Sequence, residues 1–400
     1  MPRFPSPVGS RRWMVSMSAL IAITALAVDM SLPAQPALVR DFGVAADRAQ
    51  LTLSAFLFGY AVGQLLVGYL ADACGRRVVL LVGMGLFACA GFACAVSTGL
   101  SVLTGLRFVQ GVGAASGTVV AQAMVRDAYS EAESARVFAT LIAVLALAPM
   151  VAPLIGAWLL VHVGWRAIFA TLGVCGVVLV AMTALTLGET LAKRQPSSPG
   201  AMVAAFARFF RTTGTRLPAS VVALSFASQF AFISASPFLL LEGYGIEPSH
   251  FGFYFGATAM ALMFGSVSGE RLLARGLSPQ RVVRLGAAVL LAGGVLVAIL
   301  VHVPRFGVFA LLGPMLVCFL GIGLVGPSAT ALAMGPVPEI AGTAAATLGF
   351  LEMTAGSLSG YLVTKLGIDV RAFGLTIAGL AFACACVVLR MHFAEREAQA

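Results

Sequence analysis

The stretch L-T-G-L-R-F-V-Q-G-V-G-A-A-S-G (103–117) places Arg107 inside a hydrophobic run that continues to Met124. The run is long enough to cross a bilayer core, which requires roughly 20 apolar residues. At helical spacing Arg107 shares a face with Gln110 and Gly111. Because a guanidinium keeps its charge, we expect Arg107 to face a partner or a wet cavity. The alternative is an arginine that snorkels over ~9 Å to the outer headgroups.

The composition extends this interpretation to the whole chain. Of its 400 residues, 60% are hydrophobic and 10% are charged, and the mean hydropathy is +0.99. Such values are typical of an all-α polytopic membrane protein. Apolar runs that are broken at charges, Pro and Gly predict about twelve spans. They lie near 13–33, 51–71, 78–98, 101–125, 137–160, 166–187, 218–241, 251–273, 280–302, 306–333, 341–364 and 372–391.

The basic residues predict the orientation of these spans. With the N-terminus inside, arginines and lysines favour the cytoplasmic side by roughly three to one. We therefore expect both termini to be cytoplasmic. The net charge of +9 then reflects membrane topology and anionic lipid as a partner, not nucleic acid.

Asp29 is an acid inside the first predicted span, which ends A-V-D-M-S-L-P (27–33). It lies ~7 Å from the outer end, close to the depth of Arg107. The two side chains are candidate partners in one bundle, and we expect them to couple transport to protons. The alternative is a structural ion pair with no transport role.

Glu352 is a second acid, ~16 Å into the predicted eleventh span. Small residues share its face, among them Gly349 and Gly356. We expect Glu352 to line a central cavity, either as a second proton site or for recognition of cations. The alternative is a permanently neutral acid that bonds between helices. The residues predicted to line the substrate cavity are Gln64, Gln110, Gly111 and Gly349.

The loop G-Y-L-A-D-A-C-G-R-R (68–77) combines an acid, a glycine turn and two arginines. It resembles the signature G-x-L-a-D-r-x-G-r-r of the major facilitator superfamily, with Ala73 at a position that is usually basic. The resemblance implies a conformational latch on the cytoplasmic side. Its members here are Gly68, Asp72, Gly75, Arg76 and Arg77, with Arg126 and Asp127 as nearby partners.

Other stretches carry the same resemblance. R-F-V-Q-G-V-G (107–113) is similar to the fourth-helix motif of the superfamily. A-P-M-V-A-P-L-I-G-A (148–157) resembles its antiporter motif, with alanines at two glycine positions and with Pro149, Pro153 and Gly156 present. D-M-S-L-P (29–33), Q-L-T-L-S-A-F (50–56), V-R-D (125–127) and G-W-R-A-I-F (164–169) are similar to the Bcr/CflA drug-resistance branch, which includes bicyclomycin and phenicol exporters.

An internal repeat agrees with the duplicated bundles of that superfamily. Residues 111–124 align with 321–334, and Arg107 then falls on Val317. The resemblance implies two six-helix bundles with a binding cavity between them near the midplane. We expect an N-terminal bundle at 1–187, a cytoplasmic linker with an interfacial helix at 188–217, and a C-terminal bundle at 218–400.

These features together predict a proton-coupled exporter of small, largely apolar drug-like compounds in a bacterial inner membrane. A uniporter or symporter of a small metabolite in the same fold is the alternative. We expect neither an enzyme nor a cofactor, because the chain has no H-E-x-x-H, G-x-S-x-G or P-loop motif. Its 7 cysteines and 4 histidines have no metal-ligand spacing. We expect a monomer.

Overall fold

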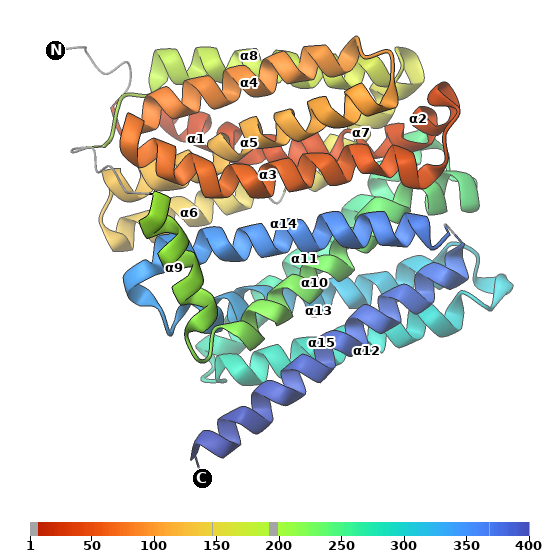
Figure 1. Cartoon of the computed structure of the whole chain (residues 1–400). Coiled ribbons are helices and arrows are strands. Elements are labelled where there is room, and N and C mark those ends of the chain that lie inside the picture. Colours follow the sequence, from red (N-terminus) through yellow and green to blue (C-terminus); the bar gives the residue numbers. More distant parts are fainter. Residues whose placement is uncertain (1–6, 146, 192–198, 368, 400) are drawn as a thin grey trace. The chain divides into compact units, whose positions relative to one another are not determined.

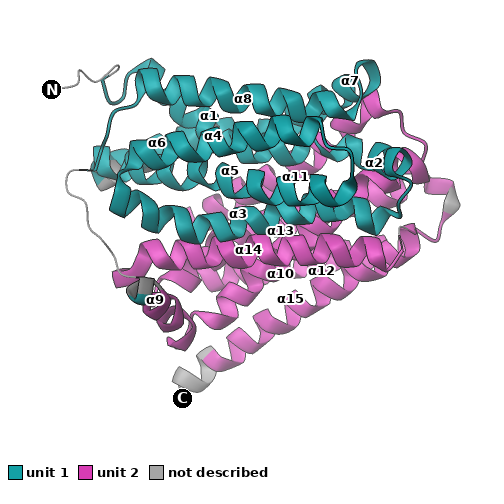
Figure 2. Ribbon diagram, turned by 45° about the horizontal axis from the view of Figure 1, so that its top comes forward, with its two compact units in different colours: residues 1–202 teal, residues 203–400 magenta. Residues whose placement is uncertain are grey.

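The computed structural model describes residues 7–145, 147–191, 199–367 and 369–399. The described chain is helical, and it contains no β-strand within those ranges. It divides into two compact units, residues 1–202 and 203–400 (Figure 2). The boundary between the units falls inside the predicted linker 188–217, of which residues 192–198 lie outside the described ranges.

Unit 1 is a helical bundle (Figure 1). Its elements are α1 (Arg11–Asp29), η1 (Leu32–Ala34), α2 (Gln35–Phe42), α3 (Ala46–Cys74), α4 (Arg76–Ala95), α5 (Leu100–Ala128), α6 (Glu131–Leu145), α7 (Ala148–His162) and α8 (Trp165–Thr186).

Unit 2 is a second helical bundle. Its elements are α9 (Pro199–Arg211), which begins just before the boundary, α10 (Arg216–Pro237), the π-helical turn η2 (Phe238–Gly243), α11 (Pro248–Ala274), α12 (Pro279–Leu300), η3 (Pro304–Phe306), α13 (Phe309–Met334), η4 (Pro338–Ile340), α14 (Ala341–Lys365) and α15 (Val370–Gln399).

Among the described residues, 10 helices are long and apolar enough to cross a membrane. The predicted fifth span is divided between α6 and α7, each of 15 residues. The predicted eleventh span corresponds to α14, whose glycines, serines and threonines lower its hydropathy and which is not among the ten. The predicted number of about twelve spans requires α14 and the α6–α7 pair in addition.

Glycine at the helix crossings brings the backbones close together, and the two units repeat this packing. A Cβ atom on Gly113 of α5 would meet the carbonyl oxygen of Gly83 on α4 at 2.7 Å. A Cβ atom on Gly321 of α13 would meet the carbonyl oxygen of Gly286 on α12 at 2.8 Å. Gly113 and Gly321 therefore make the same kind of contact at the crossings of α5 with α4 and of α13 with α12.

The predicted alignment of the repeat, which lays 111–124 on 321–334, stays a prediction. The crossing of α5 with α4 pairs Gly113 with Gly321, whereas the crossing of α5 with α3 pairs Gly111, which meets Phe56, with Gly323, which meets Leu262 on α11. These two crossings place the register on either side of the predicted one. In the predicted register Arg107 falls on Val317, which is not basic.

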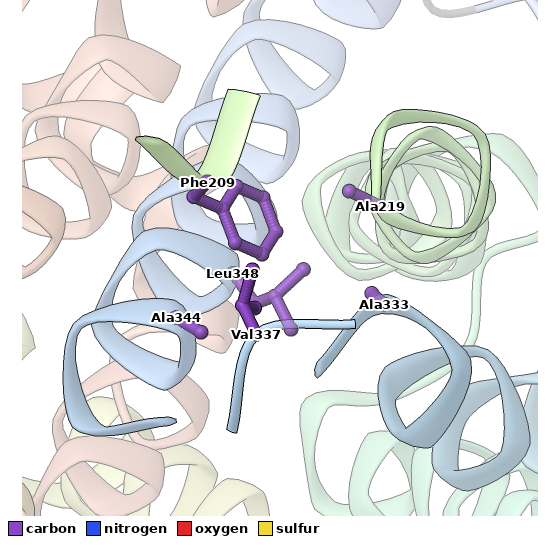
Figure 3. Packing of buried hydrophobic residues seen from close by; sticks show 6 residues of the cluster. All are labelled: Phe209, Ala219, Ala333, Val337, Ala344 and Leu348. Atoms are coloured by element: carbon purple, nitrogen blue, oxygen red, sulfur yellow. The ribbon is translucent and has the colours of Figure 1, made fainter. Parts of the chain in front are cut away.

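The helix of the linker, α9, packs on unit 2 through Phe209, which is fully buried. Figure 3 shows Phe209 beside side chains of α10, α13 and α14. The placement of this helix at the inner membrane surface stays a prediction. The ring of Phe209 fills a hydrophobic cluster of unit 2, where its large apolar surface is buried. The cluster also contains Ala219, Ala333, Val337, Ala344 and Leu348.

Candidate functional site

Arg107 is enclosed in unit 1 and is only 1% exposed. Its Nη1 donates to Oε1 of Gln110 at 2.7 Å. Its Nη2 donates to the carbonyl oxygen of Ala27 at 3.2 Å and to Oγ of Ser31 at 3.4 Å. The guanidinium therefore connects α5 with the end of α1, and the alternative of a snorkelling arginine is wrong for this conformation.

Aromatic rings cover the same guanidinium. Its Cζ atom lies 4.2 Å from the ring centroid of Phe56 on α3 and 5.5 Å from that of Phe169 on α8. Both distances are within the range of cation–π attraction. Arg107 thus touches α1, α3 and α8 from its place on α5, but in the described part of the chain it has no carboxylate partner within 4.0 Å.

Asp29 is the last residue of α1 and is 5% exposed. No hydrogen bond or ion pair reaches its carboxylate from the residues that the structure describes. The predicted contact between Asp29 and Arg107 is therefore not formed. The reason lies in helix geometry, since Ser31, which does meet Arg107, follows two residues later and projects roughly 200° away around the axis.

The antiporter-like motif packs directly after Asp29. Pro149 lies in the first turn of α7, where a missing N–H is tolerated. Pro153 is inside the helix, and Gly156 follows one turn later. A Cβ atom on Gly156 would collide with the backbone of Met30. The end of α1 is thus held between α5 on one side and α7 on the other.

Two of the predicted cavity residues are packing residues in this conformation. A Cβ atom on Gly111 would collide with the backbone of α3 at Phe56 and Tyr60. Gly111 therefore does not line a cavity, because its open side is filled by the crossing of α3 and α5. Gln110 is fully buried, and its Nε2 atom lies beside Gly91 without a hydrogen-bond partner. It orients Arg107 instead of facing open space.

The other two cavity candidates lie on α3 and α14. Gln64 on α3 is half-buried, and its Oε1 atom has no hydrogen-bond partner. Gly349 on α14 is buried. The assignment of both residues to a substrate cavity stays a prediction.

Glu352 lies between two contacts that α14 makes with α10. One turn before it, Leu348 packs in the cluster that contains Ala219. One turn after it, a Cβ atom on Gly356 would lie 3.0 Å from the rings of Phe226 and Phe230 on α10. Residues at i and i+4 share a helix face. Glu352 therefore belongs to the side of α14 that faces α10, and it has no polar partner among the described residues.

The loop signature forms a charged cluster at one end of unit 1. Nη1 of Arg76 lies 2.6 Å from Asp72, and its Nε lies 3.0 Å from Asp127 on α5. Asp72 and Arg76 of the loop signature and Asp127, predicted as a nearby partner, are thus in contact. Arg126 is exposed and takes no part in the cluster within the described chain.

Glu189, which the sequence analysis missed, holds the start of α4. Its Oε1 accepts from the backbone N–H of Arg76 at 2.9 Å, and its Oε2 accepts from that of Arg77 at 3.2 Å. An acid at a helix N-terminus satisfies unpaired N–H groups and complements the helix dipole. The only signal in the sequence is an acid just after the sixth span, in the stretch L-G-E-T (187–190).

Gly75 makes this arrangement possible. Its φ is 104°, in the region that favours glycine. A Cβ atom there would also lie 2.5 Å from Oε2 of Glu189. Gly68 has only an ordinary contact with Val119. Gly75 is therefore a member of the cluster. The packing around Gly68 does not require a glycine.

We expect Asp72→Asn to lower the rate of transport several-fold while leaving substrate affinity nearly unchanged. Asp72 is 41% exposed at its side chain, so its ion pair contributes about 0–1 kcal/mol to stability and the fold should persist. The measurement is initial transport rate against substrate concentration in proteoliposomes. Glu339→Gln is the matched control, because it breaks an exposed pair with Arg208. A raised KM with an unchanged maximal rate would place Asp72 in a binding site instead.

Two bundles of long, apolar helices define a polytopic membrane protein. The chain belongs to the Major Facilitator Superfamily, whose family model matches residues 17–360. Members of this superfamily are membrane transporters and not enzymes, which agrees with the expectation from the motifs.

Several bacterial proteins are similar over nearly the whole chain. An uncharacterized MFS-type transporter, YdgK, from Bacillus subtilis is 33% identical and covers 90% of both chains. A bicyclomycin resistance protein homolog from Haemophilus influenzae is 28% identical, and the multidrug resistance protein MdtL from Escherichia coli is 30% identical, each over 94% of both chains. These relatives confirm the predicted resemblance to the Bcr/CflA branch.

The fold is similar to that of a solved superfamily structure. The crystal structure of a D-xylose-proton symporter matches with a TM-score of 0.72 at 14% identity, over 94% of this chain and 97% of the other. The predicted all-α major facilitator fold is therefore confirmed. The chain is a multi-pass membrane transporter for small molecules.

Proposed function

We propose that the protein is a proton-coupled multidrug exporter of the bacterial inner membrane. Its substrates are small, largely apolar compounds of phenicol-like or bicyclomycin-like character. One observation carries the proposal: Asp29, a buried acid that has no partner among the described residues, lies at the helix end that Arg107 holds. The resistance-related names of the relatives support the direction of transport.

The surroundings of Asp29 suit proton coupling. An ionised carboxylate that is buried without a partner carries a large desolvation cost, and binding of a proton removes that cost. The guanidinium of Arg107 reaches Ala27 and Ser31, two residues on either side of Asp29. The carboxylate and the guanidinium meet only after a large rotation or an unwinding of this helix end, because Asp29 projects roughly 200° away from Ser31. Protonation then decides between two arrangements of α1.

The neighbouring helix α7 transmits this change. Gly156 touches the backbone of Met30, the residue after Asp29. Any rotation of the end of α1 therefore moves against α7, where a larger residue than glycine would block it. This contact gives the antiporter-like motif a physical role in the proposed cycle.

The proton gradient supplies enough free energy for export. One charge moved across 100 mV yields about 2.3 kcal/mol. One pH unit adds about 1.4 kcal/mol. For a neutral substrate, one proton then sustains a concentration gradient of roughly several hundred-fold.

The remaining parts of the proposal concern topology and the latch. Both termini are cytoplasmic, in line with the distribution of arginines and lysines. The cluster of Asp72, Arg76 and Asp127 then lies on the cytoplasmic side, where it stabilises one conformation of the cycle. The protein works as a monomer in contact with anionic lipid.

A uniporter or symporter of a small metabolite is the second candidate. The fold does not distinguish an exporter from a symporter, since a protein of similar fold is a D-xylose-proton symporter. Drug susceptibility distinguishes them. Expression of an exporter in a sensitive host raises the inhibitory concentration of chloramphenicol or bicyclomycin, and a protonophore abolishes the efflux. Uptake of sugars or amino acids with no change across a drug panel would contradict the proposal.

We propose that Glu352 contributes a second proton site or recognises cationic substrates. We expect Glu352→Gln to lower transport of a cationic dye such as ethidium at least about tenfold, because one ion pair of about 1.4 kcal/mol is lost. The measurement compares ethidium with neutral chloramphenicol in the same vesicles. Loss of ethidium alone indicates recognition, and loss of both indicates coupling. Unchanged transport of both would remove Glu352 from the site and leave it a structural acid.

A further inference from the structure

Two stretches of the sequence have no task in the proposed function, Q-L-T-L-S-A-F (50–56) and G-W-R-A-I-F (164–169). Each ends in a phenylalanine that lies against Arg107. The Cζ atom of Arg107 is 4.2 Å from the ring centroid of Phe56 and 5.5 Å from that of Phe169. Both phenylalanines are buried, at 0% and 1% exposed. Two segments far apart in the chain therefore meet at one guanidinium.

The hydrogen bonds of Arg107 satisfy its N–H groups but bring no negative charge. Their acceptors are neutral: the side-chain amide of Gln110, the carbonyl oxygen of Ala27 and the hydroxyl of Ser31. The face of an aromatic ring has a negative electrostatic potential, and it attracts a cation most strongly where water is excluded. In the described chain Phe56 and Phe169 are therefore the groups that compensate the charge of Arg107 itself.

Phe56 is held next to Arg107 by the close crossing of α3 and α5. A Cβ atom on Gly111 would collide with the carbonyl oxygen of Phe56, and one on Gly59 would collide with that of Phe108. Gly111 follows Arg107 by one helical turn, on the same face of α5. Because the two backbones touch here, the ring of Phe56 stays beside the guanidinium unless the helices separate.

Phe169 is held by another residue of its own stretch. Its ring lies 5.8 Å from that of Trp165, in an edge-to-face arrangement with an interplanar angle of 80°. Nε1 of Trp165 donates to Oδ2 of Asp41 on α2 at 2.9 Å, which fixes the indole. Since cation–π attraction weakens with distance, Phe169 is the weaker partner of Arg107 and Phe56 the stronger one.

We propose that Phe56 is a positioning residue for transport: the face of its ring attracts the guanidinium of Arg107 and keeps it where it bonds to the end of α1. Phe169 supports it as a second, weaker ring. The proposal rests on the proposed function, in which Arg107 holds that helix end. A ring with a less negative face holds the guanidinium less firmly, so the bonds to Ala27 and Ser31 form less often and transport slows.

The test replaces Phe56 by phenylalanines that carry one, two or three ring fluorines, introduced by suppression of a stop codon. Fluorine nearly preserves the shape of the ring but makes its face progressively less negative. We expect the initial rate of chloramphenicol transport in proteoliposomes to fall with each fluorine, to about a tenth with three. The same series at Phe87 is the matched control. This residue of α4 is also fully buried, and no cationic side chain of the described chain lies over its ring.

A second measurement requires neither substrate nor protons. The midpoint of thermal unfolding in detergent is recorded for the same fluorinated proteins, with Arg107 present and in Arg107→Met. We expect the midpoint to fall with each fluorine at position 56 when Arg107 is present, and to be independent of fluorine in Arg107→Met, where the charge is absent. The comparison of positions 56 and 87 with Arg107 present remains decisive if Arg107→Met does not fold.

Each result decides for or against the inference. A rate or a midpoint that does not depend on fluorine at position 56, or that falls equally at position 87, overturns it. A fall that persists in Arg107→Met also overturns it, because the ring would then act on another group. Failure of the proposed function differs from both: the wild-type protein would show no protonophore-sensitive efflux of chloramphenicol, while the midpoint would still follow the fluorine series.

Discussion

Arg107→Ala is expected to abolish transport while the protein still inserts into the membrane. The guanidinium bonds to Gln110, Ala27 and Ser31 and stacks on Phe56. Loss of charge-assisted bonds worth about 3 kcal/mol corresponds to a rate lowered by about two orders of magnitude. The measurement is the initial rate of chloramphenicol transport in proteoliposomes with an imposed pH gradient, normalised to the amount of inserted protein.

Arg107→Lys tests whether geometry or charge matters. An ammonium group has no planar fork, so it cannot donate to Gln110 and to the end of α1 at the same time. We expect less than about a tenth of the wild-type rate. Arg305→Ala serves as a control, because this exposed arginine also lies near an aromatic ring, that of Phe306 at 4.9 Å. A wild-type rate of transport in Arg107→Lys would show that a guanidinium is not required at this position.

The burial of Arg107 illustrates what the sequence alone predicts well. A charged residue in the middle of an apolar run, with Gln110 and small residues on its face, has few physical options. The long helices follow from the same apolar runs, and the cluster of Asp72 and Arg76 follows from i,i+4 spacing on neighbouring helix ends. In each case the information is local in the chain.

Three other features depend on information that is not local. Glu189 lies far along the chain from the helix start that it caps, so no pattern connects it with Arg76. The direction of Asp29 depends on a rotation of roughly 200° over two residues, which depth alone does not determine. The register of the repeat rests on which glycine meets which backbone, and G-x-G is ambiguous at a slip of two.

The proposed role of Asp29 leads to the second large effect. We expect Asp29→Asn to abolish proton-driven accumulation of substrate. The amide has nearly the same shape, and the described structure gives the carboxylate no partner that the change would break. The fold and the latch cluster should therefore persist. The measurement is chloramphenicol transport against a concentration gradient with an imposed pH gradient, and the exposed Glu242→Gln is the control.

A second assay separates coupling from substrate binding in the same variant. Exchange of labelled for unlabelled substrate across the membrane requires the conformational change but no net proton movement. An amide at position 29 resembles the protonated acid, so Asp29→Asn is fixed in one protonation state. If Asp29 only couples, the variant retains exchange at a rate within about a few-fold of wild type while accumulation is lost. If both are lost, Asp29 also binds substrate or controls the conformational change. If accumulation survives, the proton is carried elsewhere, and Glu352 on α14, which has no polar partner among the described residues, becomes the next candidate.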